Sequence, residues 1–233
     1  MITVSDLTHR FGEAVALDSV SLSIADGEFL LLVGPNGSGK TTLVRHCNAL
    51  LEPDSGTVTV DGVDVTEDPV AARTSVGMVF QHPRDQLVAA TVGADVAFGP
   101  ENLGLPRPEI DRHVEAALAA VDMGGMEDAR IDELSGGQQA RVAIAGALAM
   151  EPTHLVLDEP FAGLDLRARR SVLARLDELA ADGTSVVVVT HDLRDLRERA
   201  DRIVALADGR VVADGDPAAV VPDLEPLGVD AGC

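Results

Sequence analysis

The feature that most constrains this chain is a glycine-rich stretch that directly follows the apolar run Phe29–Val33. It reads Gly34, Pro35, Asn36, Gly37, Ser38, Gly39, Lys40, Thr41 and Thr42. Up to Thr41 it fits GxxxxGK[ST], a loop that follows a strand and opens a helix. Glycines let the backbone wrap around phosphates, and the helix start adds N–H donors. A plain glycine turn is the alternative, but a helix is predicted from Lys40 to Leu51, which favours the phosphate loop.

Four side chains have the chemistry that phosphate transfer to water needs. Lys40 can reach the β- and γ-phosphates of a nucleoside triphosphate, and the Thr41 hydroxyl can ligate Mg²⁺. Farther along, the apolar run Leu155–Leu157 ends in Asp158 and Glu159. Asp158 would hold Mg²⁺, directly or through water, and Glu159 would orient and polarise the attacking water. The alternative is a pair of solvated acids at a strand end.

A second helix start also has the form of an anion site. It reads Leu134, Ser135, Gly136, Gly137, Gln138 and Gln139. Serine is a good N-cap, and the two glycines expose the N–H groups of the first turn. The plain interpretation is a helix cap. Because the chain already has one anion-binding helix start, this one predicts a second contact to phosphate.

Strand and helix patterns alternate in the manner of an α/β fold. The strand-like runs are Ile2–Leu7, Ser19–Ile24, Glu28–Val33, Thr57–Val60, Val63–Val65, His154–Leu157, Ser185–Thr190 and Arg202–Leu206. From Thr91 to Met150 the pattern is mainly helical, with a last helix from about Gly137 to Met150. An apolar stripe in this region consists of Ile110, Val114, Ala117, Leu118 and Val121. The sequence therefore predicts an α/β core interrupted by a helical insert.

With three further residues, these motifs resemble the ATPase subunits of ATP-binding cassette (ABC) transporters over nearly the whole chain. Leu134–Gln139 resembles the signature sequence, which meets the γ-phosphate bound by the opposite protomer. Gln81 matches a glutamine that senses Mg²⁺ and the transport partner, so it is also a metal-site candidate. His191 matches the switch histidine that contacts the γ-phosphate. Ala162–Asp165 matches the loop that couples the two sites, which adds Asp165 to the nucleotide-binding set.

This resemblance implies a P-loop NTPase (RecA-like) core with an N-terminal antiparallel β subdomain and an inserted helical subdomain. Residues 1–233 would form one ABC ATPase domain, with residues 1–81 and 151–233 as the ATP-binding α/β core and 82–150 as the helical signature-motif subdomain. The implied reaction is hydrolysis of ATP with Mg²⁺. Its catalytic candidates are Lys40, Gln81, Glu159 and His191.

One position departs from the family pattern. The family usually stacks adenine on a tyrosine near the N-terminus, and this chain contains no Tyr or Trp. Phe11 is the aligned candidate, because it precedes Ala16-Leu17 and the following strand. Stacking needs only an aromatic face. The alternative is a partly buried Phe that supports the edge of the sheet.

The stretch Gln81–Gly104, like His46–Leu51, resembles the energy-coupling-factor and cobalt/nickel/biotin importer ATPases. In that group it lies near the groove that receives the membrane subunit. Asp85–Leu87 and Asp95–Gly99 are therefore expected near the partner. The possible apolar anchors are Leu87, Val88 and Phe98. The alternative for Leu87 is that it belongs only to the core of the helical insert.

The implied partners are an integral membrane transport subunit, a substrate-binding membrane subunit and a second ATPase, either another copy or a sister chain. They would hold the protein at the cytoplasmic face of the cell membrane and power uptake of a vitamin or a transition-metal ion. Another ABC importer ATPase, for amino acids or inorganic ions, and a soluble ABC ATPase not coupled to transport are the alternatives. A non-hydrolysing scaffold would lack a carboxylate such as Glu159.

Composition narrows the partners further. The chain has 39 acidic and 18 basic residues and a formal net charge of −21, and Lys40 is its only lysine. This resembles proteins of salt-accumulating archaea, and it argues against a nucleic-acid partner, which would need basic patches. No apolar run approaches the roughly 18 residues of a membrane span, so direct membrane insertion is not expected. Cys47 is predicted to be buried, and neither it nor Cys233 predicts a disulfide or a metal site.

The charge predicts that stability depends on salt. At low ionic strength the Debye length grows from about 8 to about 30 Å, so the negative charges repel one another over longer distances. Raising KCl toward molar concentration should therefore raise the melting temperature, measured by circular dichroism. A flat or falling melting temperature would contradict the halophilic interpretation of the composition.

Overall fold

A computed structural model describes residues 1–225, 228 and 229, so Cys233 lies outside the described residues. The strands are β1 Ile2–Phe11, β2 Ala14–Ile24, β3 Phe29–Val33, β4 Ser55–Val60, β5 Val63–Asp64, β6 Val76–Val79, β7 His154–Asp158, β8 Ser185–Thr190, β9 Arg202–Ala207 and β10 Arg210–Gly215. The α-helices are α1 Lys40–Cys47, α2 Pro69–Ser75, α3 Val92–Asn102, α4 Arg107–Ala120, α5 Gly136–Ala149, α6 Leu166–Ala181 and α7 Pro217–Val220. Short 3₁₀ turns lie at Pro83–Asp85, Ile131–Glu133 and Val221–Asp223.

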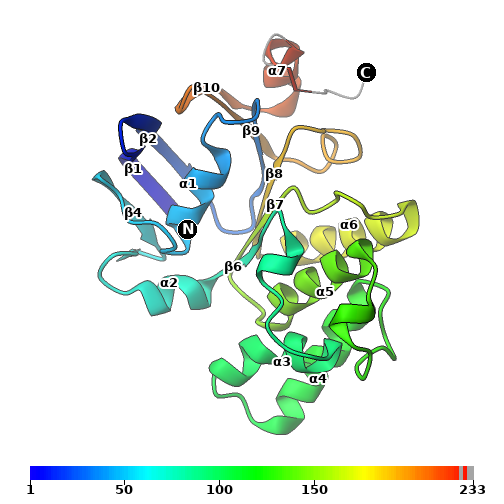
Figure 1. Ribbon diagram of the computed structural model, residues 1–233. Coiled ribbons are helices and arrows are strands. Elements are labelled where there is room, and N and C mark those ends of the chain that lie inside the picture. The colour runs from blue at the N-terminus through cyan, green and yellow to red at the C-terminus, as the bar shows by residue number, and fades with distance from the viewer. Residues whose placement is uncertain (226–227, 230–233) are drawn as a thin grey trace.

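A six-stranded sheet forms the centre of the fold, in the order β10-β9-β3-β8-β7-β6 (Figure 1). All neighbours from β9 to β6 pair in parallel, and only β10 is antiparallel. Every residue of β3, β7 and β8 is buried. These strands are covered on both faces, which explains why they are unbroken apolar runs in the sequence.

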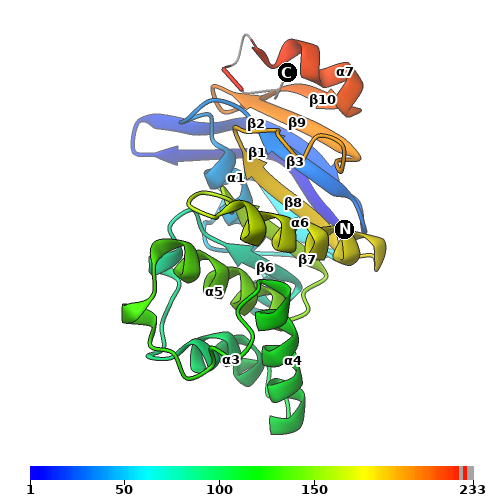
Figure 2. The same ribbon diagram turned by 90° about the vertical axis from the view of Figure 1, so that its right-hand side faces the viewer.

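The two faces of this sheet pack against different partners. On one face, Leu30 and Leu32 share a cluster with Leu43 of α1 and with the small antiparallel sheet β2-β1-β4-β5. On the other face, Leu31 and Val33 share a cluster with apolar residues of α3, α4, α5 and α6. Figure 2 shows α6 and α5 beside the central sheet, with α3 and α4 at the far end. The α/β core, the N-terminal antiparallel sheet and the helical region are therefore all present.

The helical region follows the predicted apolar pattern. All five stripe residues, Ile110, Val114, Ala117, Leu118 and Val121, are buried. Helices α3, α4 and α5 contact one another, and a Pro at the start of α4 suits a position whose N–H has no helical partner. We retain as a proposal the division of the chain into residues 1–81 and 151–233 for the core and 82–150 for the helical subdomain.

All eight predicted strands are present, and five of them are longer than predicted. The helix predicted over Lys40–Leu51 ends early. Helix α1 stops at Cys47, which is buried as expected. Ala49 adopts a φ of 55°, and the N–H of Leu50 donates to the carbonyl of Arg45 at 2.9 Å. A residue in the left-handed conformation just past the last turn ends a helix. Leu50 and Leu51 therefore lie outside α1. No helix in the described part of the chain has the length and apolar character to cross a membrane.

Candidate active site

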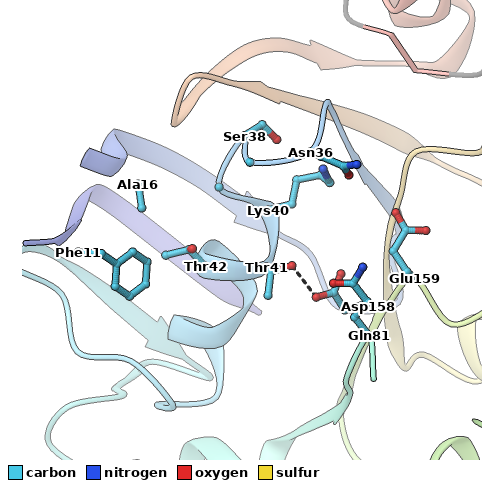
Figure 3. A pocket seen from close by; sticks show the side chains of 12 residues that line it. Phe11, Ala16, Asn36, Ser38, Lys40, Thr41, Thr42, Gln81, Asp158 and Glu159 are labelled. Carbon is cyan, nitrogen blue, oxygen red and sulfur yellow. Dashed lines mark hydrogen bonds between the residues drawn. The ribbon is translucent and has the colours of Figure 1, made fainter. Parts of the chain in front are cut away.

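A surface pocket of about 460 Å³ lies where the phosphate loop meets the ends of the central strands (Figure 3). It is lined by Phe11, Ala16, Asn36, Gly37, Ser38, Gly39, Lys40, Thr41, Thr42, Gln81, Asp158 and Glu159. Residues 36–42, from the phosphate loop and the start of α1, form more than half of this lining. Figure 3 shows Asp158 and Gln81 facing Thr41, with Phe11 at the opposite side beside Ala16 and Thr42. The pocket therefore brings together residues from four separate stretches of sequence.

Two glycines of the loop are required by close approach. Gly39 has a φ of 103°, and a Cβ there would lie 2.6 Å from the carbonyl oxygen of Ala16. At Gly34, with a φ of 143°, a Cβ would lie 2.1 Å from the carbonyl oxygen of Leu206. Residues with a side chain rarely adopt such φ angles, and a Cβ atom at either position would collide with the backbone. The tight loop therefore depends on these glycines, as the motif predicts.

Lys40 bends back over the loop. Its Nζ donates to the carbonyls of Gly34 and Pro35, at 2.8 and 2.9 Å. Burial lowers the pKa of Lys40, while the nearby Glu159 and Asp158 act in the opposite direction. Among the described residues, the buried Ser38 hydroxyl has no hydrogen-bond partner. Ser38 and Lys40 line the same pocket, and an unpaired hydroxyl together with an ammonium group suits an oxygen-rich anionic ligand, because leaving a buried hydroxyl unpaired costs about 1–3 kcal/mol.

Thr41 and Asp158 meet across the pocket. The Thr41 hydroxyl donates to Asp158 Oδ2 at 2.6 Å, from the first turn of α1 to the end of β7. Burial raises the pKa of Asp158, and the hydrogen bond from Thr41 opposes that shift. A hydroxyl and a carboxylate are hard oxygen ligands, the kind that Mg²⁺ prefers. The donor set therefore fits a magnesium ion, with Gln81 beside it in the same pocket.

Glu159 and His191 form a contact at the edge of the pocket. Glu159 Oε1 and His191 Nδ1 lie 2.6 Å apart, and the Thr190 hydroxyl donates to Glu159 Oε2 at 3.3 Å. Glu159 has a φ of 49°, a backbone conformation that is uncommon for a residue with a side chain. Thr190 was not among the candidates predicted from the sequence. Its signal is its position, because it is a polar residue at the end of an apolar strand and directly precedes His191.

The remaining candidates lie outside this pocket. Ser135 and Gln138 bond each other in a capping box at the start of α5, with Gly136 and Gly137 between them. The carboxylate of Asp165 accepts from the N–H of Ala168 at 2.8 Å and so caps α6. Within one chain, these side chains therefore act as helix caps, as the plain interpretation expects. Ala16 lines the pocket although no property of alanine marked it in the sequence.

Comparison with known proteins decides the family. The profile of a family described as ABC transporter matches residues 17–162. The chain belongs to the ABC transporter ATPase family. An ABC transporter ATP-binding protein from Halobacterium salinarum is 64% identical, over 98% of this chain and 99% of that protein. This relative agrees with the halophilic composition.

Other relatives of this ABC ATPase carry narrower names. An energy-coupling factor transporter ATP-binding protein from Methanocaldococcus jannaschii is 42% identical, over 97% of this chain and 83% of its own length. The solved structure of cbiO1 from Clostridium perfringens, part of the complex cbiONQ, has a TM-score of 0.81 at 34% identity and covers 97% of this chain and 94% of its own. The solved structure of a dimeric ATP-binding cassette bound to ADP and phosphate has a TM-score of 0.85 at 31% identity. The match covers 93% of this chain and 99% of the cassette's own chain.

The position of Phe11 generates a test. Its side chain is 55% exposed and lines the pocket, so the alternative of a partly buried supporting residue is less favoured. Stacking of a base on an aromatic ring is worth about 1–3 kcal/mol, so Phe11→Ala should weaken ATP binding about tenfold or more. Binding of inorganic tripolyphosphate should not change, because it has no base. Titration calorimetry with both ligands measures this, with Val15→Ala as an exposed control on the adjacent strand. Equal ATP affinity in Phe11→Ala and wild type would contradict the stacking role.

Proposed function

We propose that this ABC ATPase is the ATP-hydrolysing subunit of an energy-coupling-factor type importer that takes up a vitamin or a transition-metal ion. The observation that carries the hydrolytic part is the contact of Glu159 with His191 at the edge of a pocket built on a phosphate loop. The names of the relatives from Methanocaldococcus jannaschii and Clostridium perfringens support the importer part. An amino-acid or inorganic-ion importer remains the second candidate.

The roles of the pocket residues follow from their chemistry. Thr41, Asp158 and Gln81 would hold Mg²⁺, which when bound would neutralise charge on the β- and γ-phosphates. The ammonium group of Lys40 exchanges its two carbonyl partners for phosphate oxygens. The backbone N–H groups from residue 36 to residue 42 bind the phosphates at the start of α1, and Phe11 stacks on adenine.

Glu159 is the proposed general base. Its carboxylate orients a water molecule in line with the γ-phosphate. It accepts a proton from that water as the water oxygen bonds to the γ-phosphorus, while the bond from this phosphorus to the β–γ bridging oxygen breaks and ADP leaves. The imidazole of His191, 2.6 Å from Glu159 Oε1, holds that carboxylate, and we infer that it also contacts the γ-phosphate. This arrangement leaves the nucleotide bound by one group of residues and hydrolysed by another, so binding and turnover should separate in variants.

The active site needs a second protomer. Ser135, Gly136, Gly137 and Gln138 lie outside the pocket of their own chain, so we infer that they meet the γ-phosphate of a partner, and that Asp165 links the two sites. The helix start offers free N–H groups to an anion. A solved relative is dimeric with ADP and phosphate bound. The partner is another copy of this chain or a sister ATPase.

The surface behind Gln81 is the proposed docking site for the membrane subunits, which would keep the protein at the cytoplasmic face. A groove of about 200 Å³ there includes Val88 and Phe98, which are 63% and 50% exposed. Asp95 shapes it by accepting the N–H groups of Val88 and Ala89, at 2.7 and 2.9 Å. Leu87, expected as an anchor, is instead half-buried against the core. The exposed apolar anchors of the proposed groove are therefore Val88 and Phe98.

The assignment of the base is tested by Glu159→Gln. The substitution removes the proton acceptor but leaves the phosphate loop intact, so ATP affinity should stay within about twofold while kcat falls by at least about 100-fold. ATP should also convert the variant into a dimer that persists, as measured by light scattering after size-exclusion chromatography. Near-normal hydrolysis by Glu159→Gln would falsify the assignment, and a monomer in ATP would contradict the composite site.

Docking is tested by Phe98→Asp. A charge at an exposed apolar anchor should reduce co-purification with membrane subunits by about tenfold or more, because such anchors contribute 2 kcal/mol or more when truncated. The melting temperature and the ATP affinity of the isolated protein should not change. Val70→Asp, at a 69% exposed position on α2, is the matched control. Retention of the membrane subunits by Phe98→Asp at the wild-type level would rule out this groove.

A further inference from the structure

We propose that Arg169, on helix α6 behind the active site, is a positioning residue that holds the loop carrying Glu159 against the loop carrying His191. The two loops follow neighbouring strands, β7 and β8, and are otherwise separate in sequence. The inference rests on the proposed function only for the roles of Glu159 and His191. Arg169 does not line the pocket, so it acts through these loops and not on the nucleotide.

Arg169 contacts the first loop through an aromatic ring. The centre of its guanidinium group lies 5.0 Å from the ring centroid of Phe161. Phe161 comes two residues after Glu159, and the turn between them is closed by the N–H of Ala162 on the Glu159 carbonyl at 3.4 Å. Phe161 also packs against the core. A cation over the face of an aromatic ring is attracted to it, so this contact ties the short turn to α6.

The second loop is held by the edge of the same group. One terminal nitrogen of Arg169 donates to the carbonyl of Arg194 at 2.7 Å. The other lies 3.8 Å from Asp192 Oδ2, and Nε lies 3.2 Å from Asp195 Oδ2. Asp192 directly follows His191 and bonds the Arg194 side chain as well. One planar group therefore reaches three points of the loop that carries the histidine.

An arginine is suited to this task in a way that a lysine is not. Its flat group lies over Phe161 while its three nitrogens spread toward three points of the second loop, whereas an ammonium group is a single charged point. The side chain of Arg169 is 18% exposed, as is that of Asp192, so solvent screens their attraction less than it would at the surface.

The geometry of the catalytic pair explains why such a tie is needed. Glu159 and His191 meet at 2.6 Å from two different loops, and Glu159 has the unusual φ of 49°. An uncommon backbone conformation persists only where its surroundings hold it. A misplacement of about 1 Å can cost about 100-fold in rate even when it arises away from the reacting atoms. Loss of Arg169 should therefore slow hydrolysis without weakening nucleotide binding.

A purely stabilising ion pair makes a different forecast. In that case Arg169→Ala would lower the melting temperature, while kcat well below that temperature would stay at the wild-type value. The neighbouring Arg170 offers a matched control, because it is exposed on the same turn of α6. Arg170→Ala removes the same charge from the same helix and should leave kcat unchanged.

The test is steady-state hydrolysis by the purified full-length chain, with melting temperatures measured in the same buffer. Arg169→Ala should lower kcat at least about tenfold, with KM for ATP within about twofold of wild type. Arg169→Lys, which keeps the charge but not the fork, should be intermediate. Added guanidinium at tens of millimolar should restore part of the Arg169→Ala rate, and methylammonium should not.

A wild-type kcat in Arg169→Ala, with or without a lower melting temperature, overturns the proposal. If Arg169→Ala does not fold, Arg169→Lys decides: a reduced kcat at unchanged KM supports the positioning role, and a wild-type kcat overturns it. The proposed function fails separately, by normal hydrolysis in Glu159→Gln. Loss of activity in Glu159→Gln beside full activity in Arg169→Ala contradicts the role of Arg169 alone.

Discussion

Four adjacent parallel strands all end at the same edge of the sheet, and the chemistry of this protein depends on that constraint. Strands β3, β8, β7 and β6 are neighbours, and each leads directly into a segment of the proposed active site. The phosphate loop follows β3, His191 follows β8, Asp158 and Glu159 stand at the end of β7, and Gln81 comes just after β6. The hydrogen bond from Thr41 to Asp158, at 2.6 Å, joins two of these segments directly. Because the strands are buried on both faces, their ends cannot shift independently.

The sequence predicts this arrangement well where chemistry and local pattern coincide. The loop at residues 34–41 needs glycines for steric reasons that are visible at Gly34 and Gly39, and the buried strands are recognisable as unbroken apolar runs. The end of α1 was missed, because a left-handed Ala49 has no compositional signal. Arg169 was missed as well, since its partners come from two loops whose proximity only the tertiary fold creates.

The difference between Leu87 and Val88 has a similar cause. They are adjacent apolar residues, and the sequence cannot tell which of them faces inward. In the turn that Asp95 holds, Leu87 is half-buried against the core and Val88 is exposed. In this irregular segment a single side-chain hydrogen-bond acceptor decides which side chain faces the core. The periodicity of apolar residues in the sequence carries no information about such a bond. By contrast, the stripe residues on α4, which are Ile110, Val114, Ala117 and Leu118, are confirmed as buried, because a helix fixes the direction of each side chain.

We propose that one chain holds only part of an active site, since the segment beginning at Ser135 caps its own helix and lies outside the pocket. Mixing two inactive variants tests this directly. Glu159→Gln keeps the signature segment but lacks the base, and Ser135→Arg keeps the base but blocks the segment. Each should be inactive alone, and an equimolar mixture should regain part of the wild-type ATPase rate, because a mixed dimer contains one complete site. Full activity of Ser135→Arg alone, or a mixture as inactive as its components, would contradict the account.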